Sequence, residues 1–190
     1  MASINELRAR IECETGYPVP AMDPNGPREN AEVMFVLRDP GMNGAKRTMV
    51  VSPFYVGYDG TINLDDTARL QRDWFADSPL DPGRCVWWNL VPWNLPPSPK
   101  RPDKDRAPTP REYRDGAAYL PAALTALPKL SYVVLACAEA RKLTLPTKYR
   151  PVPLAHPTDH TKYGRNRPEK WREALAKMHR GLPPRTPTLS

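Results

Sequence analysis

A carboxylate, an amide and an imidazole each lie at the end of an apolar segment of this chain: Asp39, Asn89 and His156. Phe54 lies in an aromatic loop between the first two. An apolar run stopped by polar turn residues is typical of a buried strand, and open α/β sheets bind ligands at the carboxyl ends of their strands. Together these groups could bind a flat heterocycle and cleave a bond beside it: an acid, an aromatic face, an amide and an imidazole. We therefore expect these side chains to share one pocket.

Each of these residues also has a simpler interpretation. An aspartate before Pro-Gly is a common turn residue, and an asparagine after a strand often satisfies loop backbone groups. Phe54 is equally compatible with a place in the core, and His156 before a proline with a structural cap. The functional hypothesis therefore depends on the combination of residues and not on any one of them.

The elements expected to position these residues alternate between strand and helix. Apolar runs predict strands at 33–37, 85–91, 132–136 and 152–155, and helical periodicity predicts helices at 4–14, 64–76, 112–127 and 168–179, with a short helix near 139–143. This alternation predicts an α/β fold, a three-layer α/β/α arrangement with a central, mainly parallel four-stranded sheet. The length of 190 residues favours one domain, 1–190, with a loose tail over 181–190.

Composition limits the class of protein. No stretch approaches the roughly 20 apolar residues of a membrane helix, and the first residues are charged, so we expect a cytoplasmic protein and a monomer. The 25 prolines lie between the periodic segments and predict long, stiff loops. Cys13, Cys85 and Cys137 are widely spaced, which favours neither a disulfide scaffold nor a zinc site, and no cofactor is expected.

A net charge of +7 favours a polyanionic partner such as DNA, because Lys and Arg that neutralise phosphates release counterions. The basic residues gather in two proline-rich loops. In the first, around 98–111, Lys100 and Arg101 are the DNA-binding candidates, and Arg106 belongs to the same cluster. In the second, the candidates are His160, Lys162, Tyr163 and Arg165. The alternative for both loops is an ordinary solvated surface.

In order along residues 33–160, the chain resembles the uracil-DNA glycosylase superfamily. Leu37 to Gly41 match the first motif of that superfamily except for leucine in place of glycine, and His156-Pro157-Thr158 is similar to its final His-Pro-Ser. The segments between them resemble the iron-sulfur uracil glycosylases: a Pro-Phe-x-Gly loop at 53–60, an Asn-x-Val segment at 89–97 and a Glu-to-Tyr-Leu helix at 112–120.

This resemblance implies a role for each residue. Asp39 would activate water and stabilise the cationic sugar, and His156 would donate a hydrogen bond to the base O2. Asn89 would read the Watson–Crick edge, Phe54 would stack on the ring, and Arg38 would belong to the base pocket. A tyrosine follows the Asp-Pro pair in strict uracil enzymes and blocks the pyrimidine C5 position. With Gly41 in its place, the resemblance implies an open side that tolerates a substituent.

The chain also departs from the iron-sulfur enzymes. At their cluster-cysteine positions it has Trp93, Gly116 and a solitary Cys13 with no partner three residues on. A four-thiolate cluster is therefore not expected.

The sequence predicts a monofunctional DNA N-glycosylase for uracil or a 5-substituted pyrimidine, active in base-excision repair or in defence against phage with modified DNA. The first alternative is a non-catalytic DNA-binding protein of the same fold that senses a modified base. The second is a metal-dependent hydrolase using Asp39, His156, Asp159 and His160, although Pro157 disfavours a regular helix there. A plain interaction domain would show neither DNA binding nor metal. The base removed and the preference for single- or double-stranded DNA stay open.

Overall fold

The computed structural model describes residues 3–159 and 168–184, and for residues 101–105 the backbone alone. Its centre is a four-stranded sheet in the order β2-β1-β5-β6, and every pair of neighbours is parallel. The strands are β1 (Val33–Leu37), β2 (Cys85–Asn89), β5 (Tyr132–Leu135) and β6 (Arg150–Pro153). The predicted α/β class and four-stranded sheet are confirmed.

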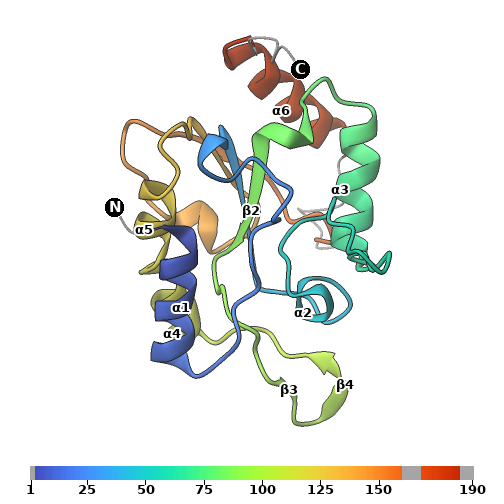
Figure 1. Ribbon diagram of the computed structural model, residues 1–190, viewed down its shortest axis with the longest axis vertical. Helices are drawn as coiled ribbons and strands as arrows, with labels where there is room; N and C mark the ends of the chain where they lie inside the picture. Colours follow the sequence, from blue (N-terminus) through green and yellow to red (C-terminus); the bar gives the residue numbers. More distant parts are fainter. Residues whose placement is uncertain (1–2, 160–167, 185–190) are drawn as a thin grey trace.

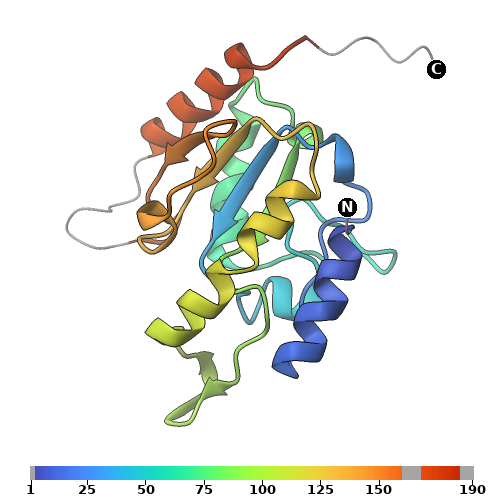
Figure 2. The same cartoon turned by 90° about the vertical axis from the view of Figure 1, so that its left-hand side faces the viewer.

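Helices cover both faces of this sheet, as Figures 1 and 2 show. Met34 and Val36 of β1 point into one apolar cluster, whereas Phe35 and Leu37 point into the other, as the two-residue repeat of a strand requires. The first cluster is covered by α1 (Ile4–Thr15), α4 (Pro110–Ala117) and α5 (Leu120–Thr125), and the second by α3 (Asp66–Ala76) and α6 (Pro168–Gly181). Both faces of β1 are therefore buried, which explains its uninterrupted apolar sequence.

Shorter elements connect this framework. They are η1 (Arg28–Asn30), α2 (Ala45–Thr48), η2 (Pro82–Arg84), η3 (Ala140–Lys142) and an antiparallel hairpin of β3 (Pro97–Ser98) and β4 (Arg101–Asp105). The hairpin projects from the body of the molecule in both Figure 1 and Figure 2. The hairpin lies in the proline-rich basic stretch, where no strand was predicted. Its prolines interrupt the alternating pattern that indicates a strand.

The single helix predicted at 112–127 is wrong. The structure has two helices, α4 and α5, separated by residues 118–119. Pro121 lies in the first turn of α5, where its missing N–H costs nothing, whereas inside one long helix its ring would clash with the preceding turn. The last strand is Arg150–Pro153, slightly earlier than predicted. It is an edge strand, where prolines are tolerated.

The chain after α6 was predicted to be loose, and this is wrong for its first residues. Leu182 is buried in the second apolar cluster, and the carbonyl of Pro183 accepts a hydrogen bond from Arg84 Nη2 at 2.8 Å. Arg84 also forms an ion pair with Glu32, so this corner of the fold is well packed. Residues 185–190 lie outside the described residues.

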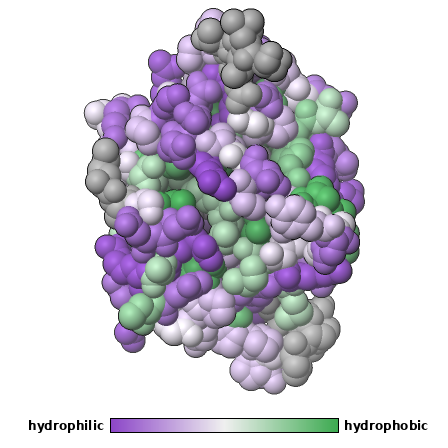
Figure 3. Space-filling view, viewed as in Figure 1, coloured by the Kyte–Doolittle hydropathy of each residue, from purple (hydrophilic) through white to green (hydrophobic). Residues whose placement is uncertain are grey.

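Within the described part of the chain, no helix has the length and apolarity needed to cross a membrane. On the face shown in Figure 3, hydrophilic residues surround a central area where apolar residues reach the surface.

Candidate active site

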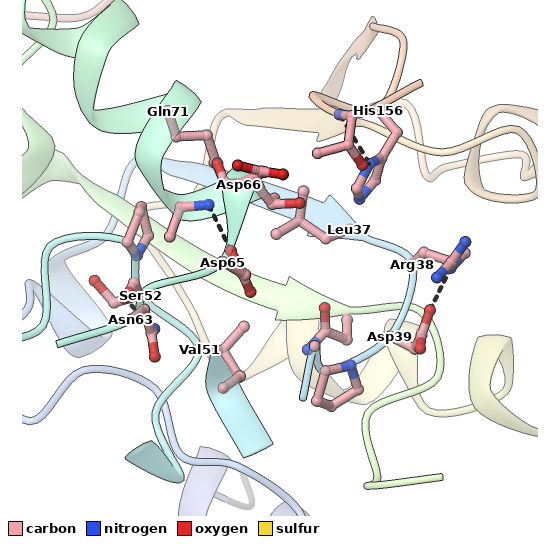
Figure 4. Close-up of a pocket in the computed structure, with 18 residues that line it drawn as sticks. Leu37, Arg38, Asp39, Val51, Ser52, Asn63, Asp65, Asp66, Gln71 and His156 are labelled. Carbon is pink, nitrogen blue, oxygen red and sulfur yellow. Dashed lines mark hydrogen bonds and ion pairs between the residues drawn. The ribbon is translucent and has the colours of Figure 1, made fainter. Parts of the chain in front are cut away.

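The strand ends open into a cavity of about 290 Å³. Arg38, Asp39, Gly41, Asn89 and His156 all line it, so the structure brings together these predicted site residues from three separate strand ends. The remaining walls come from the segment 51–53 and from the start of α3, and Figure 4 shows how these side chains lie. The predicted pocket at the carboxyl edge of the sheet therefore exists, although Phe54 does not line it.

Pairing between β1 and β2 places the acid beside the amide. Leu37 pairs with Asn89 in register, and the ladder continues as Leu90 N–H donates to Leu37 O at 2.8 Å and Val91 N–H to Arg38 O at 3.0 Å. The Asp39 side chain is only 2% exposed and forms an ion pair with Arg38 Nε, while the Arg38 side chain is 45% exposed. A buried carboxylate with a solvent-facing guanidinium partner is thus fixed at this strand end.

Asn89 is the most informative residue in the cavity. It is 2% exposed, and among the described residues its Nδ2 has no hydrogen-bond partner. A buried donor without an acceptor costs roughly 1–3 kcal/mol of folding stability, so native proteins rarely leave one unmatched. Its Nδ2 is therefore available to donate to a group that enters the cavity.

The hydrogen bonds of His156 define its tautomer. Its Nδ1 accepts from the backbone N–H of Thr158 at 3.3 Å, and the Thr158 hydroxyl lies 3.0 Å from the same nitrogen. Because a backbone N–H can only donate, Nδ1 is unprotonated and the neutral ring carries its proton on Nε2. Burial lowers the His156 pKa to about 4, the Arg38 charge acts in the same direction, and Asp159 opposes them. At neutral pH the ring is an uncharged Nε2–H donor.

Helix α6 and strand β6 position this histidine. The indole Nε1 of Trp171 donates to the Ala155 carbonyl at 3.2 Å, directly before His156. The N–H of Asp159 donates to the His156 carbonyl at 2.9 Å and closes a tight turn. The imidazole is therefore held by its own turn and by a buried tryptophan of the core.

Asp65 is a site residue that the sequence analysis missed. It is the N-cap of α3, and its Oδ1 accepts from the Ala68 N–H at 2.7 Å. Burial raises the pKa of this carboxyl, and its hydrogen bond with Ala68 partly offsets the rise. Its position as a helix cap was readable from the sequence, but nothing in the sequence indicated that its carboxylate also lines the cavity.

The side chain of Asp65 fills the space next to two glycines. A Cβ at Gly41 would lie 2.8 Å from Asp65 Oδ2, and a Cβ at Gly44 only 1.9 Å from it. The expectation of an open side at Gly41 is therefore wrong in part, because a carboxylate stands where empty space was expected. Gly44 is required there, since any side chain would displace Asp65.

The segment beside this carboxylate is fixed by polar side chains. Asn63 Nδ2 donates to the carbonyls of Val50 and Ser52 at 3.0 and 2.5 Å. Arg72 Nη1 donates to Pro53 O at 2.7 Å and to Asn63 O at 3.0 Å. These bonds tie the segment 50–53 to α3, so this wall of the cavity is a rigid one.

Phe54 is the predicted site residue that does not line the cavity. Its ring packs against Phe75 and Trp87, with centroids 5.2 and 5.6 Å apart. The structure therefore places Phe54 in the aromatic cluster under α3, which is the simpler of the two interpretations of this residue.

The predicted DNA-contact residues have different outcomes. Lys100 is exposed at the turn of the β3–β4 hairpin, whereas the side chain of Arg101 is not described. Arg106 forms a two-point ion pair with Glu112, at 2.8 and 2.6 Å, which together with the capping bonds from Thr109 lowers the pKa of Glu112 to about 2. Arg106 thus supports the start of α4. His160, Lys162, Tyr163 and Arg165 lie outside the described residues.

The residues at the cluster positions of the iron-sulfur enzymes do not fit such a group. Trp93 is buried, and a Cβ on Gly116 would lie 2.2 Å from Leu90 O, so a cysteine has no room there. Within residues 3–159 and 168–184, no group of three or more His, Cys, Asp or Glu side chains is arranged to hold a metal ion. The metal-hydrolase alternative includes His160, which lies outside those ranges.

A second cavity, of about 500 Å³, adjoins the first. Arg38, His156 and Thr158 line both cavities, so these side chains form the wall between them. Tyr113 and Glu139 lie on the far side of the second cavity. Burial raises the pKa of Tyr113 to about 12, so its hydroxyl keeps its proton. The exposed guanidinium of Arg38 therefore faces a space larger than the first cavity.

No protein-family model matches this chain, and no curated protein is similar enough to it to count as a relative.

Proposed function

We propose that this protein is a DNA glycosylase that hydrolyses the N-glycosidic bond of uracil or a 5-substituted pyrimidine and leaves an abasic site. The observation that carries this proposal is the buried, unpartnered Nδ2 of Asn89 in a cavity that also holds the Asp39 carboxylate. A carboxamide presents one donor and one acceptor side by side, which is the complement of the N3–H and O4 edge of uracil.

The other side chains suit the charges that develop during cleavage. When the C1′–N1 bond breaks, its electron pair leaves with the base, and the sugar becomes cationic. The Asp39 carboxylate stabilises the sugar, orients water toward C1′ and takes up the proton that water loses. The neutral His156 donates from Nε2 to O2, where negative charge collects on the departing base. The base then takes a proton, so the net reaction adds one water across the bond.

The size of the cavity suits a single base. Its volume of about 290 Å³ lies at the lower end of the range for small-molecule pockets, roughly 300–1,000 Å³. A base stacked in a duplex cannot reach buried side chains, so the nucleotide has to flip out at a cost of a few kcal/mol. Arg38, at the wall shared with the larger cavity, is placed to contact the backbone of the flipped nucleotide. The net charge of +7 supports binding to DNA.

The test uses duplexes with a single uracil, 5-hydroxymethyluracil or glucosylated hydroxymethylcytosine, assayed at low salt for abasic sites by alkaline cleavage. We expect release of at least one of these bases. Asp39→Asn should lower turnover by about 10³-fold while DNA binding is kept, because one transition-state charge partner is lost. Asp73→Asn is the matched control, since Asp73 is an exposed acid on α3 that pairs with Arg69.

Wild-type protein that releases none of these bases would overturn the proposal. A fully active Asp39→Asn variant would remove Asp39 from the mechanism. The chain is proposed to act without a covalent intermediate, so borohydride trapping of a protein–DNA adduct would contradict that part of it.

A second candidate is a non-catalytic protein that binds a modified base. The position of Phe54 favours it, because the ring expected to stack on the base packs in the core instead. This candidate predicts tight, modification-selective binding to DNA and no abasic product.

A further inference from the structure

One end of the cavity is acidic, which is unusual for a protein expected to bind a polyanion. Asp65, Asp66 and Thr67 line this end together with Ser52. Asp66 is exposed and lies 3.3 Å from Arg69, whereas Asp65 is partly buried. The group of the ligand that reaches this end cannot be a phosphate, because a carboxylate would repel it.

The role of Asp65 as a helix cap accounts for only one of its oxygens. Oδ1 accepts the Ala68 N–H, but Oδ2 points at Gly41 and Gly44 and receives no hydrogen bond from any described residue. The guanidinium of Arg72, whose charge acts on the pKa of Asp65, donates instead to the carbonyls of Pro53 and Asn63. Oδ2 therefore lies beside Gly41 on a wall of the cavity that Asp65 and Gly41 both line, whereas Asn89 contributes a donor to the same cavity.

The geometry of a pyrimidine ring decides which atom meets this acceptor. C2 and C5 lie on opposite corners of the ring, so a base whose O2 is bound by His156 directs C5 away from the imidazole. Figure 4 shows His156 and Asp65 on separate sides of the site, with Leu37 between them in this view. In the proposed complex, a substituent on C5 therefore lies on the side of Asp65, whose carboxylate occupies the space next to Gly41 and Gly44.

We propose that Asp65 selects pyrimidines whose C5 substituent carries a hydrogen-bond donor, such as a hydroxymethyl or an aminomethyl group. This inference rests on the proposed function and adds the class of substrate. A hydroxyl or ammonium group would donate a hydrogen bond to Oδ2. The methyl of thymine would desolvate the carboxylate without forming a hydrogen bond to it. The cavity thus discriminates between substituents of nearly equal size by their polarity.

The test compares thymine with 5-hydroxymethyluracil in otherwise identical duplexes, since the two differ by one hydroxyl. Dissociation constants are measured in the Asp39→Asn background, where turnover does not interfere, and base release is measured with wild type. We expect wild type to favour 5-hydroxymethyluracil by roughly 10- to 100-fold. Asp65→Asn should reduce this ratio to near one, because an amide NH₂ replaces the acceptor.

Asp65→Asn is a suitable variant because asparagine is as good an N-cap as aspartate, so α3 keeps its first turn. Asp73→Asn, on the same helix, is the control and should leave the ratio unchanged.

The outcomes separate this inference from the proposed function. Base release without a preference for the hydroxymethyl group, or a preference that survives Asp65→Asn, overturns the inference and leaves the glycosylase intact. Selective binding that depends on Asp65, without base release, supports the inference and overturns the enzymatic proposal. Absence of both binding preference and base release overturns the two together.

Discussion

Two walls of one cavity are built in different ways. The strand-end wall carries Asp39, Asn89 and His156 at the carboxyl ends of β1, β2 and β6, three strands of the same parallel sheet. The helix wall carries Asp65 at the N-cap of α3, and its carboxylate fits into the space that the missing side chains of Gly41 and Gly44 leave. In the proposed function, the first wall would contact groups that all pyrimidine nucleotides share or that define the pairing edge. The second would contact a single substituent.

If the proposed function holds, this difference assigns reactivity to the first wall and selectivity to the second. The strand-end wall depends on the sheet, which is buried on both faces, so its groups are held rigidly and at a cost in stability. The helix wall depends on one capping residue, and changing it alters few other contacts. We therefore expect substitutions in the first wall to affect catalysis or stability strongly, and those in the second to affect substrate choice.

After Asp39→Asn, the largest effect is expected at the unpartnered amide. Asn89→Leu keeps the shape of the side chain but removes both polar groups, so base release should fall by at least about 100-fold. The same change should leave the free energy of unfolding unchanged or raise it by roughly 1–3 kcal/mol, because the buried donor no longer lacks a partner. Urea denaturation and the abasic-site assay measure the two effects.

Asn94→Leu is the matched control for this variant. Asn94 also has a buried atom without a described partner, Oδ1, but it does not line the cavity. It should change stability without lowering base release. If Asn89→Leu were destabilised and fully active, the amide would be a structural group, and the contrast between the walls would disappear.

The next effect concerns the pH dependence of stability. The pKa of His156 is about 4 in the folded protein and about 6.5 in an unfolded chain, so the unfolded state binds the proton first as pH falls. This residue therefore costs no stability above pH 6.5, and the cost grows to about 3 kcal/mol as pH falls to 4. His156→Gln should flatten this part of the stability profile, measured by urea denaturation between pH 7.5 and 4.

The exposed His179 provides the control, because His179→Gln removes an imidazole that does not line the cavity. A His156→Gln protein whose stability falls as steeply as that of the wild type would show that the imidazole is not buried in its neutral form. The neutral Nε2–H tautomer assigned to His156 would then be wrong.

The smallest effect is expected outside both walls. Lys100→Ala, at the tip of the β3–β4 hairpin, should weaken DNA binding a few-fold and reduce the slope of log K against log salt by about 1. The weakening should be equal for modified and unmodified DNA, because a phosphate contact reads no base. Lys129→Ala is the control, since Lys129 donates to Asn30 next to the opposite end of the sheet. Equal salt slopes for Lys100→Ala and wild type would remove the hairpin from the DNA interface.

Much of the framework was readable from local patterns. The apolar runs located β1, β2 and β5 because strands buried on both faces carry few polar residues. The polar residues after β1, β2 and β6 identified Asp39, Asn89 and His156 as candidates, since the carboxyl ends of parallel strands lie at one edge of the sheet. The bond from Thr158 to His156 spans two residues, so even the tautomer follows from a local turn.

Tertiary packing decided the rest. Phe54 was placed in the core by Phe75 and Trp87, which no loop pattern identifies as its neighbours. The lack of a partner for Asn89 is a property of everything around it and has no signature in the chain. Asp65 reaches Gly41 and Gly44 only because α3, which packs on one face of the sheet, begins beside the strand ends and brings residues more than twenty positions apart into contact. Sequence determined which groups the sheet edge presents, and the packing of α3 determined what lies opposite them, because contacts between distant segments depend on how whole elements fit together.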